Sequence, residues 1–160
     1  MRVLGVDPGT RVTGYGVVDD GEDSGAGIPG HLVECGIIRF RPRSPLAQRL
    51  HELHDGIAGL IARHRPTALA LENAFYQKNV HTTLVLGHAR GVVLLAAQQA
   101  GVEICEYAPA TIKRTVAGGG AARKAQVATM VARLLRLREA PRPSDAADGV
   151  AIALTHILRS

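Results

Sequence analysis

Four acidic residues stand where predicted secondary-structure elements begin or end, and they are the side chains most suited to chemistry. Asp7 and Glu72 each follow a short apolar run that predicts a buried strand, whereas Asp145 and Asp148 open the last predicted helix. Strand ends and helix starts are the places where α/β proteins build their sites. Four carboxylates brought together would repel one another unless cations neutralised them, and the matching ion for oxygen ligands of this kind is Mg²⁺ or Mn²⁺. The set therefore predicts a divalent-metal site.

Each of these acids also has an ordinary structural interpretation. Aspartate is common at the start of a turn, where it bonds its own backbone, and a Pro-Gly pair follows Asp7 directly. Glu72 could be a solvated strand end. Asp145 and Asp148 share one helix face and would suit the cap and first turn of a helix, because the helix dipole favours acids there. The prediction of a site rests on the four acids as a set.

Lys124 is the basic residue that we expect closest to this site. It falls seven residues before Val131, nearly in phase with the apolar stripe of its predicted helix, so its side chain should point toward the sheet. An ammonium there could neutralise the acidic cluster or meet a scissile phosphate. The alternative is an end-of-helix lysine that extends along apolar surface to reach solvent.

Basic residues are concentrated in the tract from residue 109 to residue 138, which has no acidic residue. The net charge of the chain is +5, and such a tract could follow a phosphate backbone. The tract contains Lys113, Arg114, Arg123, Lys124, Arg133, Arg136 and Arg138.

Phe75 and Tyr76 form an aromatic pair that closely follows Glu72 and precedes Lys78. An aromatic side chain in a loop beside a metal site could stack on an unpaired base. The alternative is packing of the pair against the helix that follows.

The composition is that of an ordinary soluble globular domain, with 160 residues, 46% apolar and 21% charged. The N-terminus lacks the layout of a signal peptide, and no apolar run approaches the length of a membrane span. Cys35 and Cys105 stand alone in apolar surroundings, as free thiols do in a reducing compartment. We therefore expect a cytoplasmic protein without membrane association, and we interpret its histidines as structural.

Hydrophobic patterning predicts an α/β fold in one domain, residues 1–160. A meander of three strands is followed by crossovers, which implies a five-stranded mixed sheet flanked by helices. The predicted strands are residues 2–7, 13–18, 32–40, 67–72 and 102–107. The predicted helices are one with Ser44 as N-cap and Pro45 in first position, then 80–100, a turn after Pro109, 121–137 and 144–159.

Several blocks of the chain together resemble RuvC, the family of bacterial Holliday-junction resolvases. The blocks are residues 5–16, 72–75, 86–91, 113–120 and 145–148, and the resemblance covers essentially the whole length. It implies an RNase H-like fold, a homodimer in the bacterial cytoplasm, and the branch-migration proteins RuvA and RuvB as partners.

The resemblance also implies roles for individual residues. It makes Asp7, Glu72, Asp145 and Asp148 the metal-binding catalytic carboxylates. It places Lys113 and Lys124 near the scissile phosphate and Phe75 against the bases of the junction. With Tyr76, Lys78, Arg114 and Arg123 these residues form the predicted DNA-binding set.

The corresponding mechanism is hydrolysis of phosphodiester bonds with two Mg²⁺ ions in each active site, for which Mn²⁺ would substitute. Asp7 would bridge the ions, and Lys124 would stabilise the charge that develops on the phosphate. A twofold dimer would present two such sites to a four-way DNA junction of matching symmetry, and paired nicks would serve recombination and repair.

Three other functions are compatible with parts of the sequence. An RNase H-like nuclease for structured RNA, such as a ribosomal precursor, would also begin with a similar strand and turn. The motif Asp7-x-Gly9-Thr10 resembles the phosphate loop of actin-like ATPases and sugar kinases, although those chains are much longer. A junction-binding module that does not cut is the third, but a pure binder has no need to gather carboxylates near phosphates.

Overall fold

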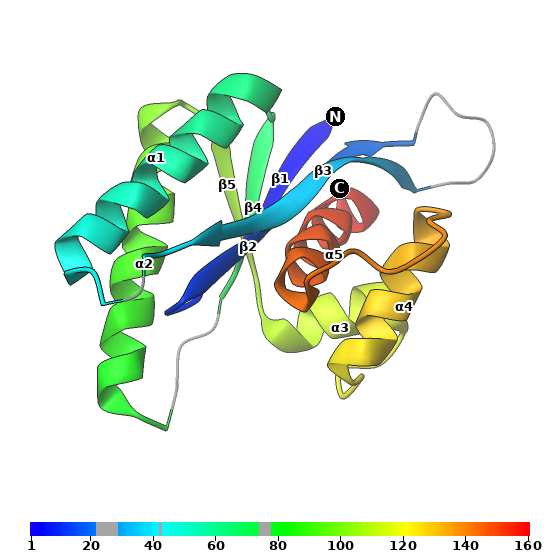
Figure 1. The fold of residues 1–160 in the computed structure, drawn as a ribbon. Helices are drawn as coiled ribbons and strands as arrows, with labels where there is room; N and C mark the ends of the chain where they lie inside the picture. Colours follow the sequence, from blue (N-terminus) through cyan, green and yellow to red (C-terminus); the bar gives the residue numbers. More distant parts are fainter. Residues whose placement is uncertain (22–28, 42, 74–77) are drawn as a thin grey trace.

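A five-stranded mixed sheet forms the centre of the computed structural model, which describes residues 1–21, 29–41, 43–73 and 78–160 (Figure 1). The strands are β1 (Arg2–Asp7), β2 (Val12–Asp20), β3 (Gly30–Arg39), β4 (Ala68–Glu72) and β5 (Glu103–Tyr107). They lie in the order β3-β2-β1-β4-β5. The first three are antiparallel, while β1, β4 and β5 run parallel. The predicted mixed sheet is therefore confirmed.

Helices cover both faces of the sheet (Figure 1). One face carries α1 (Leu46–His64) and α2 (Val80–Gln99), and the other carries α5 (Ser144–Arg159). Two shorter helices, α3 (Pro109–Ala117) and α4 (Lys124–Leu134), pack against α5. Each layer buries its own apolar core against the sheet.

Glycines let α5 lie directly on β1 and β2. A Cβ atom at Gly5 would stand 2.1 Å from the carbonyl oxygen of Gly149, and one at Gly14 would stand 1.9 Å from the carbonyl oxygen of Asp145. Both are shorter than any contact a side chain tolerates, so only glycine permits this approach. The close contact fixes the first turn of α5 over the end of β1.

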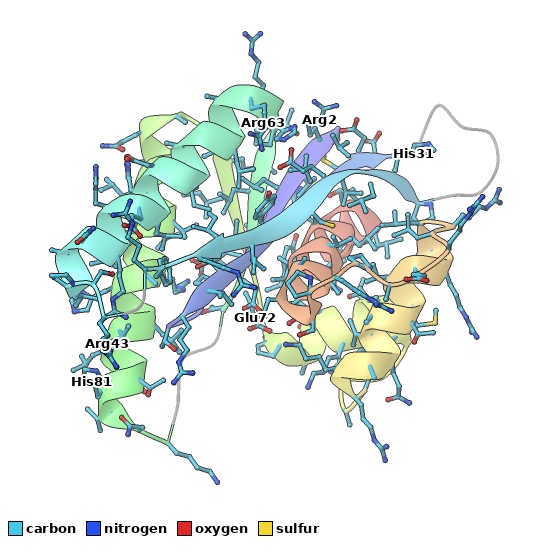
Figure 2. The ribbon with its side chains drawn as sticks, in the orientation of Figure 1. Arg2, His31, Arg43, Arg63, Glu72 and His81 are labelled. Carbon is cyan, nitrogen blue, oxygen red and sulfur yellow. The ribbon has the colours of Figure 1, made fainter. Side chains whose placement is uncertain are left out.

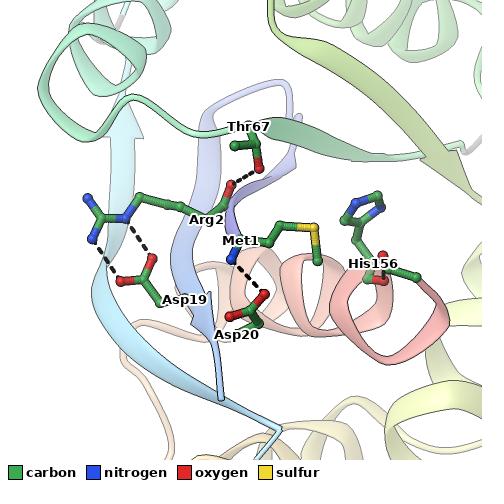
Figure 3. Close-up of polar contacts among 7 residues, drawn as sticks. Met1, Arg2, Asp19, Asp20, Thr67 and His156 are labelled. Atoms are coloured by element: carbon green, nitrogen blue, oxygen red, sulfur yellow. Dashed lines mark hydrogen bonds and ion pairs between the residues drawn. The ribbon is translucent and has the colours of Figure 1, made fainter. Parts of the chain in front are cut away.

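Ion pairs hold the amino end of β1, opposite the end that carries Asp7 (Figure 3). The Met1 ammonium lies 2.6 Å from a carboxylate oxygen of Asp20, and Arg2 donates to both oxygens of Asp19 at 2.6 and 2.7 Å. Asp19 and Asp20, the last two residues of β2, are therefore paired within the fold.

Two predicted helix starts differ from the structure. The helix α1 begins at Leu46 with Pro45 as its N-cap, because the Ser44 hydroxyl donates to the Arg41 carbonyl (2.8 Å) instead of capping the helix. The helix α4 spans Lys124–Leu134 rather than residues 121–137, so Lys124 is its first residue. The last helix has the predicted bounds.

The helix α2 has an exposed apolar side. By length and composition it could cross a membrane, with a mean hydropathy of 1.4 over 18 residues of which 28% are buried. It nevertheless packs against α1 and β5 within the fold. Its outward residues Val80, Leu84 and Leu95 are 75%, 60% and 51% exposed. Such a stripe indicates a surface that another apolar surface covers.

Candidate active site

Three carboxylates converge at the carboxyl end of β1. Asp7, Asp145 and Asp148 each offer an oxygen, and these oxygens all lie within 4.8 Å of one another. Asp7 is more than 130 positions from the other two in the chain, so only the fold brings it to them. The convergence that the sequence analysis required is therefore present.

Strand alternation explains why Asp7 faces α5. Along β1, Val3 packs into the core beneath α5, whereas Leu4 and Val6 pack into the core beneath α1 and α2. Successive side chains of a strand point to opposite faces, so Asp7 shares the side of Val3. Asp145 and Asp148 are three apart on α5 and project from one face of its first turns.

Glu72 reaches the same region from the neighbouring parallel strand β4. Ala70 belongs to the core beneath α5, so alternation also directs Glu72 to that face. Glu72 lines a cavity of about 250 Å³ together with Asp7, Asp148, Lys113 and Lys124. It lies outside the group of three oxygens, on the wall of that cavity. Figure 2 shows it between the two helical layers.

The electrostatics of the cluster oppose its full ionisation. Burial, followed by the charges of Glu72, Asp148 and Asp145, raises the pKa of Asp7 to about 8 from its ordinary 3.8. Burial also raises the pKa of Glu72 and of Asp148, in each case against the opposing charge of Lys124. Near neutral pH the cluster therefore takes up a proton or another cation.

Lys124 supplies positive charge to this cluster. Its ammonium nitrogen lies 2.5 Å from Asp148 and 3.8 Å from Asp145, which confirms that the side chain points inward. Burial lowers the pKa of Lys124, but the hydrogen bond and charge of Asp148 outweigh that effect and raise it. Lys124 therefore stays charged beside the carboxylates.

The remaining predicted DNA-binding residues lie around the cavity or outside the described part of the chain. Lys113 lines the cavity from α3. Arg114, Arg123 and Lys78 are exposed. Phe75 and Tyr76 belong to residues 74–77, which lie outside the described residues. DNA contact by all six remains a prediction.

A second cavity, of about 300 Å³, adjoins the carboxylates on the side of α2. Asp7 and Glu72 line it as well, so they form a wall shared by the two cavities. Its other polar side chains are Thr10, Thr82 and Arg90. The sequence analysis did not single out Thr82 or Arg90, because their place depends on how α2 packs beside β1.

The donor set fits a hard divalent cation. All of the converging ligand atoms are carboxylate oxygens, and burial together with the neighbouring carboxylates raises the pKa of Asp7, so a bound cation would stabilise the ionised cluster. Oxygen-only sites of this kind suit Mg²⁺ or Mn²⁺ rather than zinc, for which sulfur and imidazole ligands are typical.

Comparison with known proteins gives a consistent result over the whole chain. Residues 3–156 match the family described as Crossover junction endodeoxyribonuclease RuvC. The RuvC protein of Halorhodospira halophila is 53% identical over 155 residues, which cover 97% of this chain and 89% of that protein. That of Pelotomaculum thermopropionicum is 47% identical over 156 residues, with 98% and 92% covered.

Solved structures agree with this result. The RuvC protein of T. thermophilus in complex with a Holliday junction substrate superposes with a TM-score of 0.90 at 38% identity, covering 99% of this chain and 94% of that one. The yeast mitochondrial Holliday junction resolvase, at 14% identity and a TM-score of 0.71, covering 98% and 78%, shares the fold. Fold, acidic cluster and sequence together show that the chain belongs to the RuvC family of crossover junction endodeoxyribonucleases.

Proposed function

We propose that this protein resolves four-way DNA junctions by paired nicks, in recombination and DNA repair, and that Asp7, Glu72, Asp145 and Asp148 form its metal-dependent catalytic centre. The observation that carries the proposal is the convergence of Asp7, Asp145 and Asp148 within 4.8 Å, in a chain of the RuvC family. Such a charge density at a nucleic-acid enzyme's cavity calls for cations. A module that only binds junctions would gain nothing from it.

The four carboxylates would hold two Mg²⁺ ions, for which Mn²⁺ would substitute. When bound, the ions lower the pKa of a water molecule and neutralise the leaving oxygen. Lys124 has a separate role: its ammonium already lies beside Asp148 and would stabilise the negative charge that develops on the phosphate. The cavity walls that include Lys113 and Lys124 would position the phosphate beside the carboxylates.

The DNA contacts divide into phosphate contacts and base contacts. Lys113, Arg114, Arg123 and Lys78 would hold phosphates, which makes binding fall steeply with salt. Phe75 and Tyr76 follow Glu72 by a few residues and would stack on bases that are unpaired at the crossover.

The protein would act as a homodimer through α2. Val80, Leu84 and Leu95 expose apolar surface, and Gly87 and Gly91 leave open space between them. A helix with small and apolar residues on one side can approach a second copy closely. We assign residues 1–160 to one nuclease domain that works in the bacterial cytoplasm, with RuvA and RuvB as its branch-migration partners.

The test is cleavage of a synthetic four-way junction in Mg²⁺, with a linear duplex of the same sequence and a structured RNA as competitors. Symmetric nicks at the junction, abolished by EDTA and not inhibited by excess RNA, are the expected result. Preferred cleavage of the RNA would make the protein a ribonuclease of the same fold. Tight junction binding without nicks in Mg²⁺ or Mn²⁺ would make it a binding module.

A further inference from the structure

A second cationic surface lies on the far side of the carboxylates from Lys113 and Lys124. It is formed by Arg39, Arg41 and Arg43, in a stretch from residue 39 to residue 49 that has no acidic residue. Arg39 pairs with Val12 at the end of the β2–β3 ladder, beyond the level at which Asp7 ends β1. The surface therefore lies at the same end of the sheet as the candidate active site.

A tight turn holds two of these arginines in place. The Ser44 backbone nitrogen and hydroxyl both donate to the Arg41 carbonyl, at 3.2 and 2.8 Å. Arg43 adopts a left-handed conformation (φ 62°) inside this turn and is exposed. The Arg41 side chain is 79% exposed, and its guanidinium lies 3.5 Å from the Glu52 carboxylate, a largely solvent-exposed pair of little strength. Both guanidinium groups are available to a phosphate.

The second cavity lies on this same side of the carboxylates, where α1 and α2 cover the sheet. Asp7 and Glu72 form its inner wall, and the hydroxyls of Thr10 and Thr82 are on its lining. Arg49 of α1 donates to the Thr10 carbonyl at 3.4 Å, which ties this lining to the helix that follows the arginine turn. A cavity lined by two threonines, on the side of the sheet from which the arginine turn leads into α1, suits a sugar–phosphate unit.

Figure 2 shows how charge is placed at the two ends of the sheet. Arg43 lies at the lower left of the view, on the α1–α2 side, whereas Arg2 and Arg63 lie at the top, at the amino end of β1. Asp7 and Glu72 thus stand between the cavity lined by Lys113 and Lys124 and the second cavity on the α2 side, and the arginine turn leads into α1 on that second side.

We infer that the DNA strand crosses the active site from the α3–α4 side to the α1–α2 side, and that Arg41 and Arg43 hold phosphates on one flank of the scissile bond. The inference rests on the proposed function and adds the path of the strand. The phosphates on the other flank belong to the basic tract that begins at Lys113.

The experiment measures binding of a four-way junction without divalent ions, as a function of salt. The test variant is Arg41→Gln/Arg43→Gln. Its matched control is Arg63→Gln/Arg65→Gln at the other end of α1. Arg63, like Arg41, is an exposed arginine paired with a glutamate, and Arg65, like Arg43, has a positive φ (47°). Both variants lower the net charge equally, so only the location of the charge differs.

The loss of two phosphate contacts should make the negative slope of log K against log salt shallower by about 1.8. It should also weaken binding on the order of tenfold per contact near 0.1 M salt. The control should keep the wild-type slope. Arg41→Lys/Arg43→Lys should restore it, since counterion release depends on charge. Equal losses of junction binding in the test and control variants would overturn the inference. The proposed function would still hold if the wild type binds and cuts the junction.

Phosphate ethylation interference on the same junction tests the path. The Arg41→Gln/Arg43→Gln variant should lose interference on one side of the cleavage site, and Arg114→Gln on the other. Loss on the same side in both variants would refute the path. A wild-type protein that neither binds nor cuts the junction would overturn the proposed function itself.

Discussion

Replacing Asp7 by asparagine should stabilise the metal-free protein while abolishing cleavage. Burial and the neighbouring carboxylates raise the pKa of Asp7 to about 8 from 3.8, so between these pH values the native protein holds a proton that the unfolded chain has lost. The stability from this proton is complete below pH 3.8 and declines as the pH rises towards 8. Each pH unit in that interval costs about 1.36 kcal/mol, which amounts to about 4 kcal/mol at pH 7.

Asparagine keeps the shape of the side chain but carries no charge at any pH. In EDTA at pH 8 the Asp7→Asn variant should therefore melt on the order of 10 °C above the wild type, since each 1 kcal/mol shifts Tm by ~2–4 °C in a domain of this size. The gap should close as the pH falls to 4. Mg²⁺ should raise the Tm of the wild type and leave the variant nearly unchanged. The variant should still bind a junction within a few-fold.

Asp19 provides a control of opposite sign. The hydrogen bond from Arg2 lowers the pKa of Asp19, so its contribution is present above the ordinary pKa and is lost as the pH falls through the lowered value. Asp19→Asn should therefore lower the Tm at pH 7 and have less effect in acid. If Asp7→Asn instead lowers Tm at pH 8 in EDTA, or if Mg²⁺ raises the Tm of both proteins equally, the electrostatic reasoning is refuted.

Three further predictions concern Lys124, Gly149 and α2. Lys124→Ala should slow cleavage by ~100-fold or more at saturating junction while changing the junction Kd only a few-fold, and equal losses in both would make Lys124 a plain phosphate clamp. Gly149→Ala places a Cβ 2.5 Å from the backbone of Tyr15, so it should lower the free energy of unfolding by ~1–3 kcal/mol. It should also weaken Mg²⁺ binding measured by calorimetry. The control Gly59→Ala, whose Cβ would have nothing within 4 Å, should raise the free energy of unfolding by ~0.5–1 kcal/mol. Leu84→Glu/Leu95→Glu should give a monomer in light scattering with an unchanged circular dichroism spectrum, and a persistent dimer would exclude α2 as the interface.

Much of the site was predictable because local rules place its residues. An apolar run ending in an acid predicts where Asp7 and Glu72 leave the sheet, and a spacing of three puts Asp145 and Asp148 on one helix face. The inward direction of Lys124 followed from its phase relative to the apolar stripe. These inferences need only the periods of strands and helices.

The rest depends on contacts between distant parts of the chain. Nothing local indicates that Gly14 and Gly149 let α5 lie on β1 and β2, yet this approach sets the distance between Asp7 and the helix carboxylates. The second cavity needs α2 beside the β1 turn, so no local rule indicated that Arg90 of the matched block 86–91 would line it. The prediction that Ser44 caps α1 was wrong because the Ser44 hydroxyl donates to the Arg41 carbonyl instead. Residue type alone does not indicate which of these two local hydrogen bonds is preferred.

Anomalous diffraction from crystals soaked in Mn²⁺ would locate the metal site itself. We predict density for Mn²⁺ within coordination distance of Asp7, Asp145 and Asp148, lost in crystals of Asp7→Asn and absent from the amino end of β1. The proposed metal site would be contradicted if the crystals show no manganese density at these carboxylates although the same protein cuts junctions in solution.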